Sequence, residues 1–214
     1  MGLCYASHSD RESWLADRKR GIGASEAAAI YGVSKWSNPV RLWEEKCGLR
    51  KPKDLGGVSY VEQGARAEGP IRELFGILHP EYEVTSRPFD MLYQEERPWL
   101  YATLDGELTE KETGERGILE IKKHEIQSRR DWQEWDGQVP IYYYTQICHQ
   151  LLATGFSFAW LYAALISWNG EVRLRPYFFL RDGCLDDMEL LLKEETEFWG
   201  CVQTRRRPAT KLTL

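Results

Sequence analysis

The dipeptide Asn169-Gly170 is the sequence feature that most constrains the fold, because it joins two long segments rich in aromatic and branched residues, at 158–168 and 171–180. An Asn-Gly pair between two such segments is the strongest short-range signal for a β-hairpin. A periodic apolar segment at 141–153 precedes the hairpin and predicts a helix. A helix directly before a hairpin favours folds in which helices cover a β-sheet.

The other segments predict further helices and strands. Apolar periodicity and capping residues predict helices at 9–14, 25–31, 39–46, 59–78 and 182–202. Ser25 is the expected N-cap of the second of these helices, and Pro70 is expected to bend the fourth. A loop is expected at 51–57, and three strands are expected to form a meander, at 82–93, 99–108 and 116–122. The order predicts a single-domain α/β fold over residues 1–214, with a central mixed β-sheet flanked by helices and a short basic tail from about residue 204.

Composition argues against several classes of protein. No apolar run approaches the roughly 20 residues of a membrane span, and the first residues lack a cationic, apolar signal segment. The five cysteines are scattered without a Cys-x-x-Cys pair, which argues against a zinc or iron–sulfur cluster and is typical of a reducing compartment. We therefore expect a cytoplasmic protein with no membrane partner.

The net charge of −5 by itself argues against a nucleic-acid partner, because phosphate binding is driven by Lys and Arg. Basic residues nevertheless gather locally, at 18–20, 122–123, 129–130 and 205–207. Each cluster is either a solvated face, which is the more common case, or part of a binding surface.

The triplet Glu120-Ile121-Lys122 lies in one of the predicted strands. Residues two apart in a strand share a face, so Glu120 and Lys122 are expected to lie side by side. Asp105, upstream in a neighbouring strand, supplies a second carboxylate for the same place. The resulting Asp…Glu-x-Lys pattern is that of metal-dependent phosphodiesterases, although Glu-x-Lys is also common on ordinary solvated strands.

Phosphodiester hydrolysis needs a nucleophilic water, neutralised phosphate charge and a stabilised leaving group, which two Mg²⁺ ions provide. Mg²⁺ prefers oxygen ligands, and Glu68, Asp105 and Glu120 would be enough to bind it. Lys122 would hold or polarise the attacking water. The Ile121 side chain is expected in the core, so this residue contributes to a metal site only through its backbone carbonyl.

Gln146 and Gln150 lie four apart in the helix at 141–153 and therefore share a face. They are either ordinary surface residues or orient the lysine and the water. His149, between them, is expected to be a hydrogen-bonded structural histidine rather than a phosphate ligand. The aromatic residues of the same region either stack on unpaired bases or belong to the core: Trp132, Trp135, Tyr142, Tyr143 and Tyr144.

Several motifs occur in a fixed order along the chain. They are Trp14-Leu15-Ala16-Asp17-Arg18, Gly21-Ile22-Gly23-Ala24-Ser25-Glu26, Trp43-Glu44-Glu45-Lys46-Cys47-Gly48, Gly64-Ala65-Arg66-Ala67-Glu68, Thr103-Leu104-Asp105-Gly106, Leu119-Glu120-Ile121-Lys122 and Gln146-Ile147-Cys148-His149-Gln150. The series resembles YqaJ-type phage recombinases over about residues 14–165; these are relatives of lambda exonuclease in the PD-(D/E)xK nuclease superfamily. The resemblance implies a PD-(D/E)xK restriction-endonuclease-like core.

The resemblance also implies roles for the acidic and basic residues. Glu68, Asp105 and Glu120 correspond to the metal-binding acids, and Lys122 corresponds to the catalytic lysine. Gln146 corresponds to the glutamine of the helix behind the active site. The implied cofactor is a pair of Mg²⁺ ions, for which Mn²⁺ can substitute.

Arg18 and Ser25 correspond to residues that hold a 5′-terminal phosphate, with the Thr103 hydroxyl nearby. The implied activity is 5′→3′ degradation of one strand of linear double-stranded DNA, which leaves 3′ single-stranded tails for recombination by single-strand annealing. The implied partners are DNA with a 5′-phosphate end, an annealing protein and two further copies of the chain in a ring-shaped homotrimer. The implied setting is a bacterial host cell, with a phage or prophage origin.

Two departures from the family pattern affect this interpretation. Gly69 separates Glu68 from Pro70, where many relatives have proline directly after the acid, and Cys148 replaces a second glutamine. Neither removes a ligand. Two other functions stay open at this point: an endonuclease with the same chemistry, and a catalytically idle DNA-binding or annealing partner.

Overall fold

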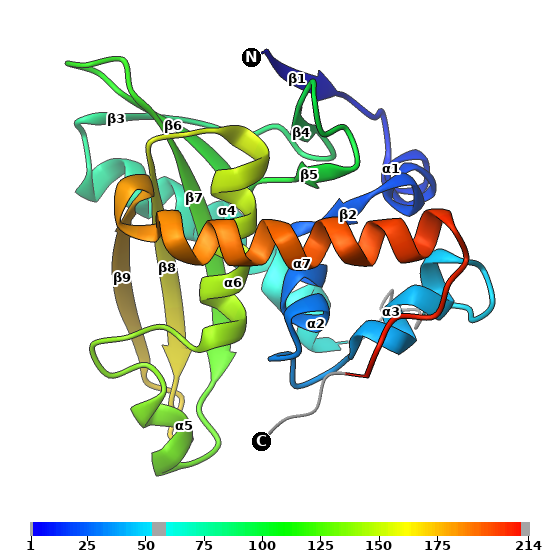
Figure 1. Ribbon diagram of the computed structural model, residues 1–214. Helices are drawn as coiled ribbons and strands as arrows, with labels where there is room; N and C mark the ends of the chain where they lie inside the picture. The colour runs from blue at the N-terminus through cyan, green and yellow to red at the C-terminus, as the bar shows by residue number, and fades with distance from the viewer. Residues whose placement is uncertain (1, 53–58, 211–214) are drawn as a thin grey trace.

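The strands of the protein form two sheets (Figure 1), seen in a computed structural model that describes residues 2–52 and 59–210. The larger sheet has the order β3-β6-β7-β8-β9, and the smaller has the order β1-β4-β5-β2. The loop expected at 51–57 lies largely outside the described residues. The strand bounds are β1 Leu3–Ala6, β2 Ile22–Gly23, β3 Tyr82–Thr85, β4 Met91–Gln94, β5 Leu100–Ala102, β6 Gly106–Glu110, β7 Arg116–Glu125, β8 Phe158–Ile166 and β9 Val172–Leu180.

The predicted helices are confirmed, with small shifts at their ends. Their bounds are α1 Arg11–Asp17, α2 Ala27–Tyr31, α3 Pro39–Lys46, α4 Ser59–Leu78, α6 Ile141–Thr154 and α7 Leu185–Gln203. A further short helix, α5 Arg129–Gln133, was not predicted. The helix α4 continues through Pro70, so Glu68 lies within regular helix. None of the described helices is long and apolar enough to cross a membrane.

The predicted hairpin is confirmed as β8 and β9, which pair antiparallel from Phe158 opposite Leu180 to Ile166 opposite Val172. Gly170 has a φ of 82°, a left-handed conformation that favours glycine. The preceding strand β7 runs parallel to β8, and α6 makes the crossover between them. The larger sheet is therefore mixed, as the sequence predicted.

The predicted three-strand meander is wrong, because two of its strands are each divided between the two sheets. The first breaks at 86–90, where Pro88 lacks a donor and Phe89 has a φ of 66°. The second breaks at 103–105, between β5 of the small sheet and β6 of the large one. Thr103 and Asp105 consequently lie in the connection between the sheets.

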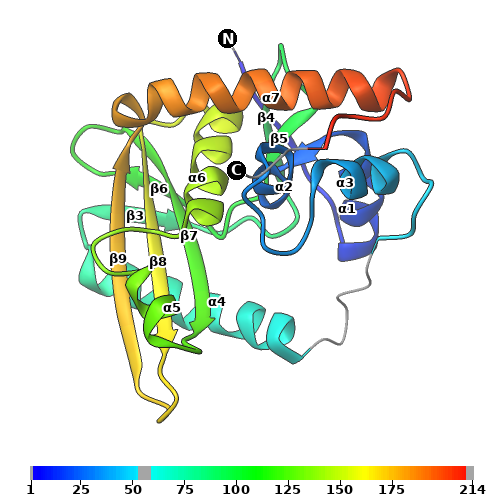
Figure 2. The same ribbon diagram turned by 60° about the horizontal axis from the view of Figure 1, so that its bottom comes forward.

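Alternate residues of β7 face different helices. Leu119 and Ile121 pack with Phe75 of α4, which confirms that Ile121 is a core residue. Ile118 packs on the other side with apolar residues of α6, and α7 covers α6 in turn (Figure 1). Figure 2 shows α4 on the opposite face of the sheet from α6. Glu120 and Lys122 share the face of Ile118 because side chains alternate along a strand.

Candidate active site

Glu120 and Lys122 form an ion pair in the middle of β7. The Nζ atom of Lys122 lies 2.5 Å from Oε1 of Glu120, and the Glu120 side chain is only 3% exposed. Burial by itself would lower the pKa of Lys122, but the negative charges of Glu120 and Asp105 outweigh burial and raise it above the ordinary value. Lys122 is therefore an ammonium ion at neutral pH.

Two glutamines of α6 donate hydrogen bonds to the Glu120 carboxylate. The Gln146 amide donates to Oε1 of Glu120 at 2.7 Å, and the Gln150 amide donates to Oε2 at 2.5 Å. Both glutamines thus face the sheet, and Gln150 is fully buried. They do not lie on the helix surface, which was the alternative interpretation of their spacing.

Asp105 reaches the same place from the connection between β5 and β6. Its Oδ2 accepts a hydrogen bond of 2.7 Å from the backbone N–H of Ile121. The ladder between β6 and β7 ends at Gly106 opposite Leu119, which leaves this N–H free for the carboxylate. Burial raises the pKa of Asp105 well above its ordinary value, and repulsion from Glu120 and Glu68 raises it further.

Glu68 approaches from α4. Burial raises its pKa, and the nearby charge of Glu120 raises it further. One turn along the helix, Arg72 donates to the backbone carbonyl of Asp105 at 2.8 Å and so fixes α4 to the loop that carries this acid. The sequence analysis missed Arg72; its four-residue spacing from Glu68 was the available signal.

The acids have the chemistry of a divalent-cation site. Among the residues that the structure describes, no three His, Cys, Asp or Glu side chains lie close enough together to hold an ion. The Glu120 oxygens instead face α6 and Lys122, while burial first, and then repulsion between the carboxylates, raises the pKa values of Asp105 and Glu68. A hard cation would relieve that repulsion and would draw Glu120 toward the other two acids. The donor set therefore fits Mg²⁺.

The residues expected to hold a phosphate also lie together. The Arg18 guanidinium donates to the Ser25 hydroxyl at 3.1 Å and stacks over the Trp14 ring at 4.6 Å. The Trp14 indole N–H donates to the Thr103 hydroxyl at 3.0 Å. Since Thr103 precedes Asp105 by two residues, this group adjoins the acidic cluster.

A buried ion pair positions Arg18 and Ser25. Glu26 caps the short helical turn Ala24–Glu26 by accepting from the Gly23 N–H at 2.9 Å, so the prediction of Ser25 as the N-cap is wrong. Lys46 of α3 lies 2.7 Å from the Glu26 carboxylate and donates to the Arg18 carbonyl at 2.9 Å. Burial favours a protonated Glu26, but Lys46 and Arg18 outweigh burial and lower its pKa. Lys46 lies in one of the ordered sequence motifs, but the sequence assigned it no role.

His149 is a buried structural residue, as expected. Its Nδ1 lies 2.6 Å from a Glu195 carboxylate oxygen of α7, and its Nε2 lies 2.9 Å from the Tyr101 carbonyl of β5. With a carboxylate on one side and a carbonyl on the other, both ring nitrogens donate only in the imidazolium form. Burial lowers the pKa of His149, but the Glu195 charge and both hydrogen bonds outweigh it and raise the pKa.

The aromatic cluster divides between the core and the surface. Trp135 and Tyr142 are buried. Tyr143 packs beside the site, with its ring 5.0 Å from Nζ of Lys122. Trp132 is only partly buried and lines an open cavity.

Two matches establish the relationships of the chain at the level of sequence. The family model of the YqaJ-like viral recombinase domain matches residues 13–157. The protein YqaJ of Bacillus subtilis (strain 168) is 30% identical over 203 residues, which cover 92% of this chain and 58% of that protein. The chain thus spans less than two thirds of the length of this relative.

Solved structures show the same fold. The alkaline exonuclease LHK-Exo from Laribacter hongkongensis has a TM-score of 0.62 at 17% identity, over 92% of this chain and 97% of that one. LHK-Exo in complex with dAMP matches over the same shares, with a TM-score of 0.62 at 16% identity. These likenesses confirm the predicted α/β fold class. On the family match and the identity to YqaJ, the chain belongs to the YqaJ-like viral recombinase family.

Proposed function

We propose that the chain is a metal-dependent deoxyribonuclease that degrades one strand of linear double-stranded DNA in the 5′→3′ direction. The 3′ single-stranded tails would serve recombination by single-strand annealing. One observation carries this proposal: a lysine and a carboxylate paired at 2.5 Å on β7 adjoin two further, partly buried acids whose pKa values are raised. The fold shared with an alkaline exonuclease, solved also in complex with dAMP, supports it.

The residues proposed to hold two Mg²⁺ ions are Glu68, Asp105, Glu120 and the Ile121 carbonyl. The Ile121 N–H points to Asp105, and the N–H and C=O of one strand residue point to the same edge, so its carbonyl oxygen faces the site. Bound Mg²⁺ supplies an activated water and neutralises phosphate charge, and Mn²⁺ has ligand preferences that allow it to substitute. Gln146 and Gln150 keep the Glu120 carboxylate at the site.

Lys122 acts as a cation in this proposal. Its Nζ lies 2.5 Å from the Glu120 carboxylate, which places the positive charge beside the proposed metal ligands. Its ammonium group orients the attacking water and stabilises the negative charge that develops on the phosphate.

The Arg18, Ser25 and Thr103 group is the proposed binding site for the 5′-terminal phosphate. A guanidinium presents a rigid fork of donors that matches phosphate oxygens. Trp14 supports this fork through its ring and fixes the Thr103 hydroxyl through its N–H.

The test of the nuclease is digestion of linear and closed circular duplex DNA, with and without Mg²⁺, by the wild type, Lys122→Ala and Lys123→Ala. Lys123 is the matched control because it is the next residue and pairs with Glu125 at 3.0 Å. We expect Lys122→Ala to abolish digestion of linear DNA and Lys123→Ala to preserve it. Unchanged digestion by Lys122→Ala would contradict the catalytic assignment.

The other outcomes identify the alternatives. Cutting of the closed circle would make the protein an endonuclease. If calorimetry detected neither Mg²⁺ nor Mn²⁺ binding, the protein would be an idle DNA-binding or annealing partner.

The phosphate site needs a separate test, with Arg18→Gln assayed on duplexes that carry a 5′-phosphate or a 5′-hydroxyl. We expect the variant to lose rate mainly on phosphorylated ends. An equal loss on both ends would argue against recognition of the phosphate.

We also propose a ring-shaped homotrimer that works with a single-strand annealing protein. A ring repeats a few basic residues around a channel and so focuses positive potential on DNA despite the negative net charge. A monomeric mass in light scattering at assay concentrations would exclude the ring.

A further inference from the structure

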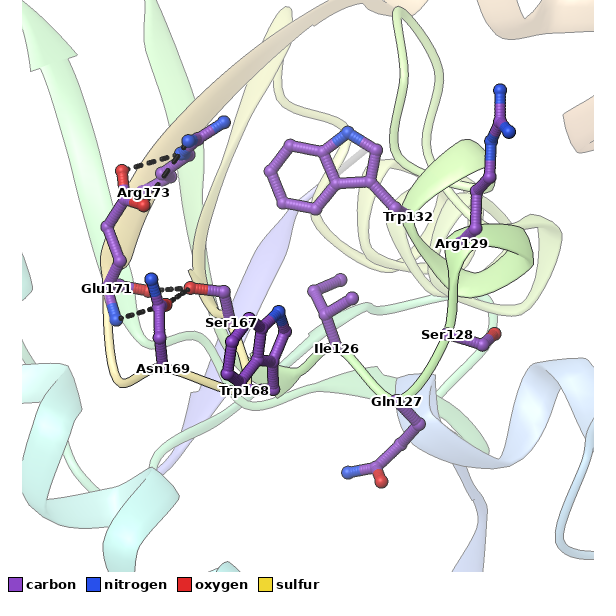
Figure 3. A pocket seen from close by; sticks show the side chains of 10 residues that line it. All are labelled: Ile126, Gln127, Ser128, Arg129, Trp132, Ser167, Trp168, Asn169, Glu171 and Arg173. Carbon is purple, nitrogen blue, oxygen red and sulfur yellow. Dashed lines mark hydrogen bonds and ion pairs between the residues drawn. The ribbon is translucent and has the colours of Figure 1, made fainter.

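An open cavity of about 540 Å³ lies between the tip of the β8–β9 hairpin and α5. Figure 3 shows its lining, which includes the side chains of Ile126, Arg129, Trp132, Trp168 and Arg173. We refer to it as the Trp132–Trp168 pocket. Neither the acids of the active site nor the Arg18 group lines it.

The pocket presents aromatic faces to the solvent. Trp168 is 93% exposed at the hairpin tip, where an apolar ring of this size gains nothing from folding. Trp132 is partly buried and lies across the pocket, with Ile126 between the two indoles in the view of Figure 3. Flat aromatic faces of this kind stack on nucleic-acid bases.

The charges around the pocket suit a polyanion. The guanidinium groups of Arg173 and Arg175 lie 5.3 and 5.7 Å from the Trp132 ring. Arg129 adds a third positive charge to the lining. The acid in the lining, Glu171, is paired with Arg173 at 2.9 Å, so the surroundings keep a positive excess.

The pocket continues the row of side chains that forms the active site. Glu120, Lys122 and His124 alternate on one face of β7, and Ile126 directly follows this strand. Ile126 lies four positions after Lys122, a distance of about 13 Å at about 3.3 Å per residue of strand. His124 bonds to Asp131 at 2.9 Å and thereby fixes α5 at the end of the row.

We propose that the Trp132–Trp168 pocket binds unpaired nucleotides of a DNA single strand, with bases against the two indoles and phosphates against the arginines. The inference rests on the proposed nuclease function for its choice of DNA. At about 3.4 Å per nucleotide of a stacked strand, the pocket lies about four nucleotides from the scissile phosphate. The pocket would bind a strand that has separated from its complement near the acids of the active site. A fully paired duplex would not bind there, because its base faces are stacked inside the helix.

The test measures binding of a fluorescent oligothymidylate with a 5′-hydroxyl end, by anisotropy in EDTA. These conditions remove both the metal and the 5′-phosphate, so they isolate the pocket from the active site. The variants are Trp168→Leu, which keeps an apolar side chain, and Trp168→Phe, which keeps an aromatic face. Ile77→Ala on α4 is the control, since Ile77 is also exposed, at 74%.

We expect Trp168→Leu to raise the Kd about tenfold or more, since stacking on one aromatic ring supplies that much. Trp168→Phe should recover most of the affinity, and Ile77→Ala should leave it unchanged. Arg175→Gln should reduce the slope of log Kd against log salt by about 0.7, the value for one phosphate contact to a single strand.

Digestion of linear duplex by the same preparations separates this inference from the proposed function. If the wild type digests DNA but Trp168→Leu binds the oligothymidylate as tightly as the wild type, the pocket assignment is overturned. If no preparation digests DNA while Trp168→Leu still loses affinity tenfold, the nuclease proposal fails and the pocket assignment stands.

Discussion

Replacing Glu195 with glutamine tests the charge of the buried pair that links α6 to α7. In the wild type, His149 donates to Glu195 at 2.6 Å and to the Tyr101 carbonyl at 2.9 Å, and both side chains of the pair are fully buried. Glutamine keeps the shape of the carboxylate, and its amide can donate to Nδ1 of a neutral imidazole. The variant therefore keeps two hydrogen bonds but removes the reason for the raised His149 pKa.

The size of the effect on stability follows from the proton that His149 binds in the folded state. Because the His149 pKa is raised on folding, its stabilising contribution is complete below the unfolded value of about 6.5 and is lost as pH rises toward the folded value. Between these two values the folded state holds one proton more than the unfolded state. The stability of the wild type relative to Glu195→Gln should therefore fall as pH rises above about 6.5, by at most about 1.4 kcal/mol per pH unit.

Urea unfolding at half-unit intervals from pH 6 to 9 measures this difference. Glu197→Gln is the matched control, because Glu197 lies on the same helix and is exposed. It should follow the wild type at every pH. Parallel curves for the wild type and Glu195→Gln would refute the imidazolium assignment of His149.

Three further changes have defined outcomes. Gln150→Leu removes an amide that holds the β7 carboxylate, and we expect digestion of linear duplex to slow about 10- to 100-fold. Gly21→Ala places a Cβ 2.3 Å from the backbone oxygen of Trp99, so calorimetry should show a melting temperature lower by about 5 °C or more. Lys46→Met leaves the Glu26 carboxylate without its ion-pair partner and should cost about 3 kcal/mol in urea unfolding at pH 7. Because the pKa of Glu26 is lowered on folding, its ionised carboxylate stabilises the wild type above about pH 4.5, and this contribution is lost as pH falls. The difference in unfolding free energy between the wild type and Lys46→Met should therefore become smaller in acid.

Local patterns in the sequence were sufficient for most elements of secondary structure. Helix ends follow from caps and glycines, such as Asn38 before α3 and Gly155 after α6, and these interactions lie within one turn. The shared face of Glu120 and Lys122 follows from the two-residue period of a strand. Family membership was also predicted from the sequence, through the order of its short motifs.

Long-range packing decided which strands pair with one another. The segments at 82–93 and 99–108 have strand composition throughout, yet breaks at 86–90 and 103–105 divide them between two sheets. Strand composition records the preference of each residue and does not specify a partner strand, which only tertiary pairing selects. The second break is what brings Asp105 to the end of the β6–β7 ladder.

The contacts that support the site likewise appear only in three dimensions. Lys46 pairs with Glu26 across 20 positions, and His149 pairs with Glu195 across 46. No periodicity connects such residues, because the energy of a buried pair depends on desolvation and geometry that exist only after the elements pack. The sequence by itself predicted the side chains that the proposed chemistry uses, and the tertiary structure decided which residues position them and set their charge.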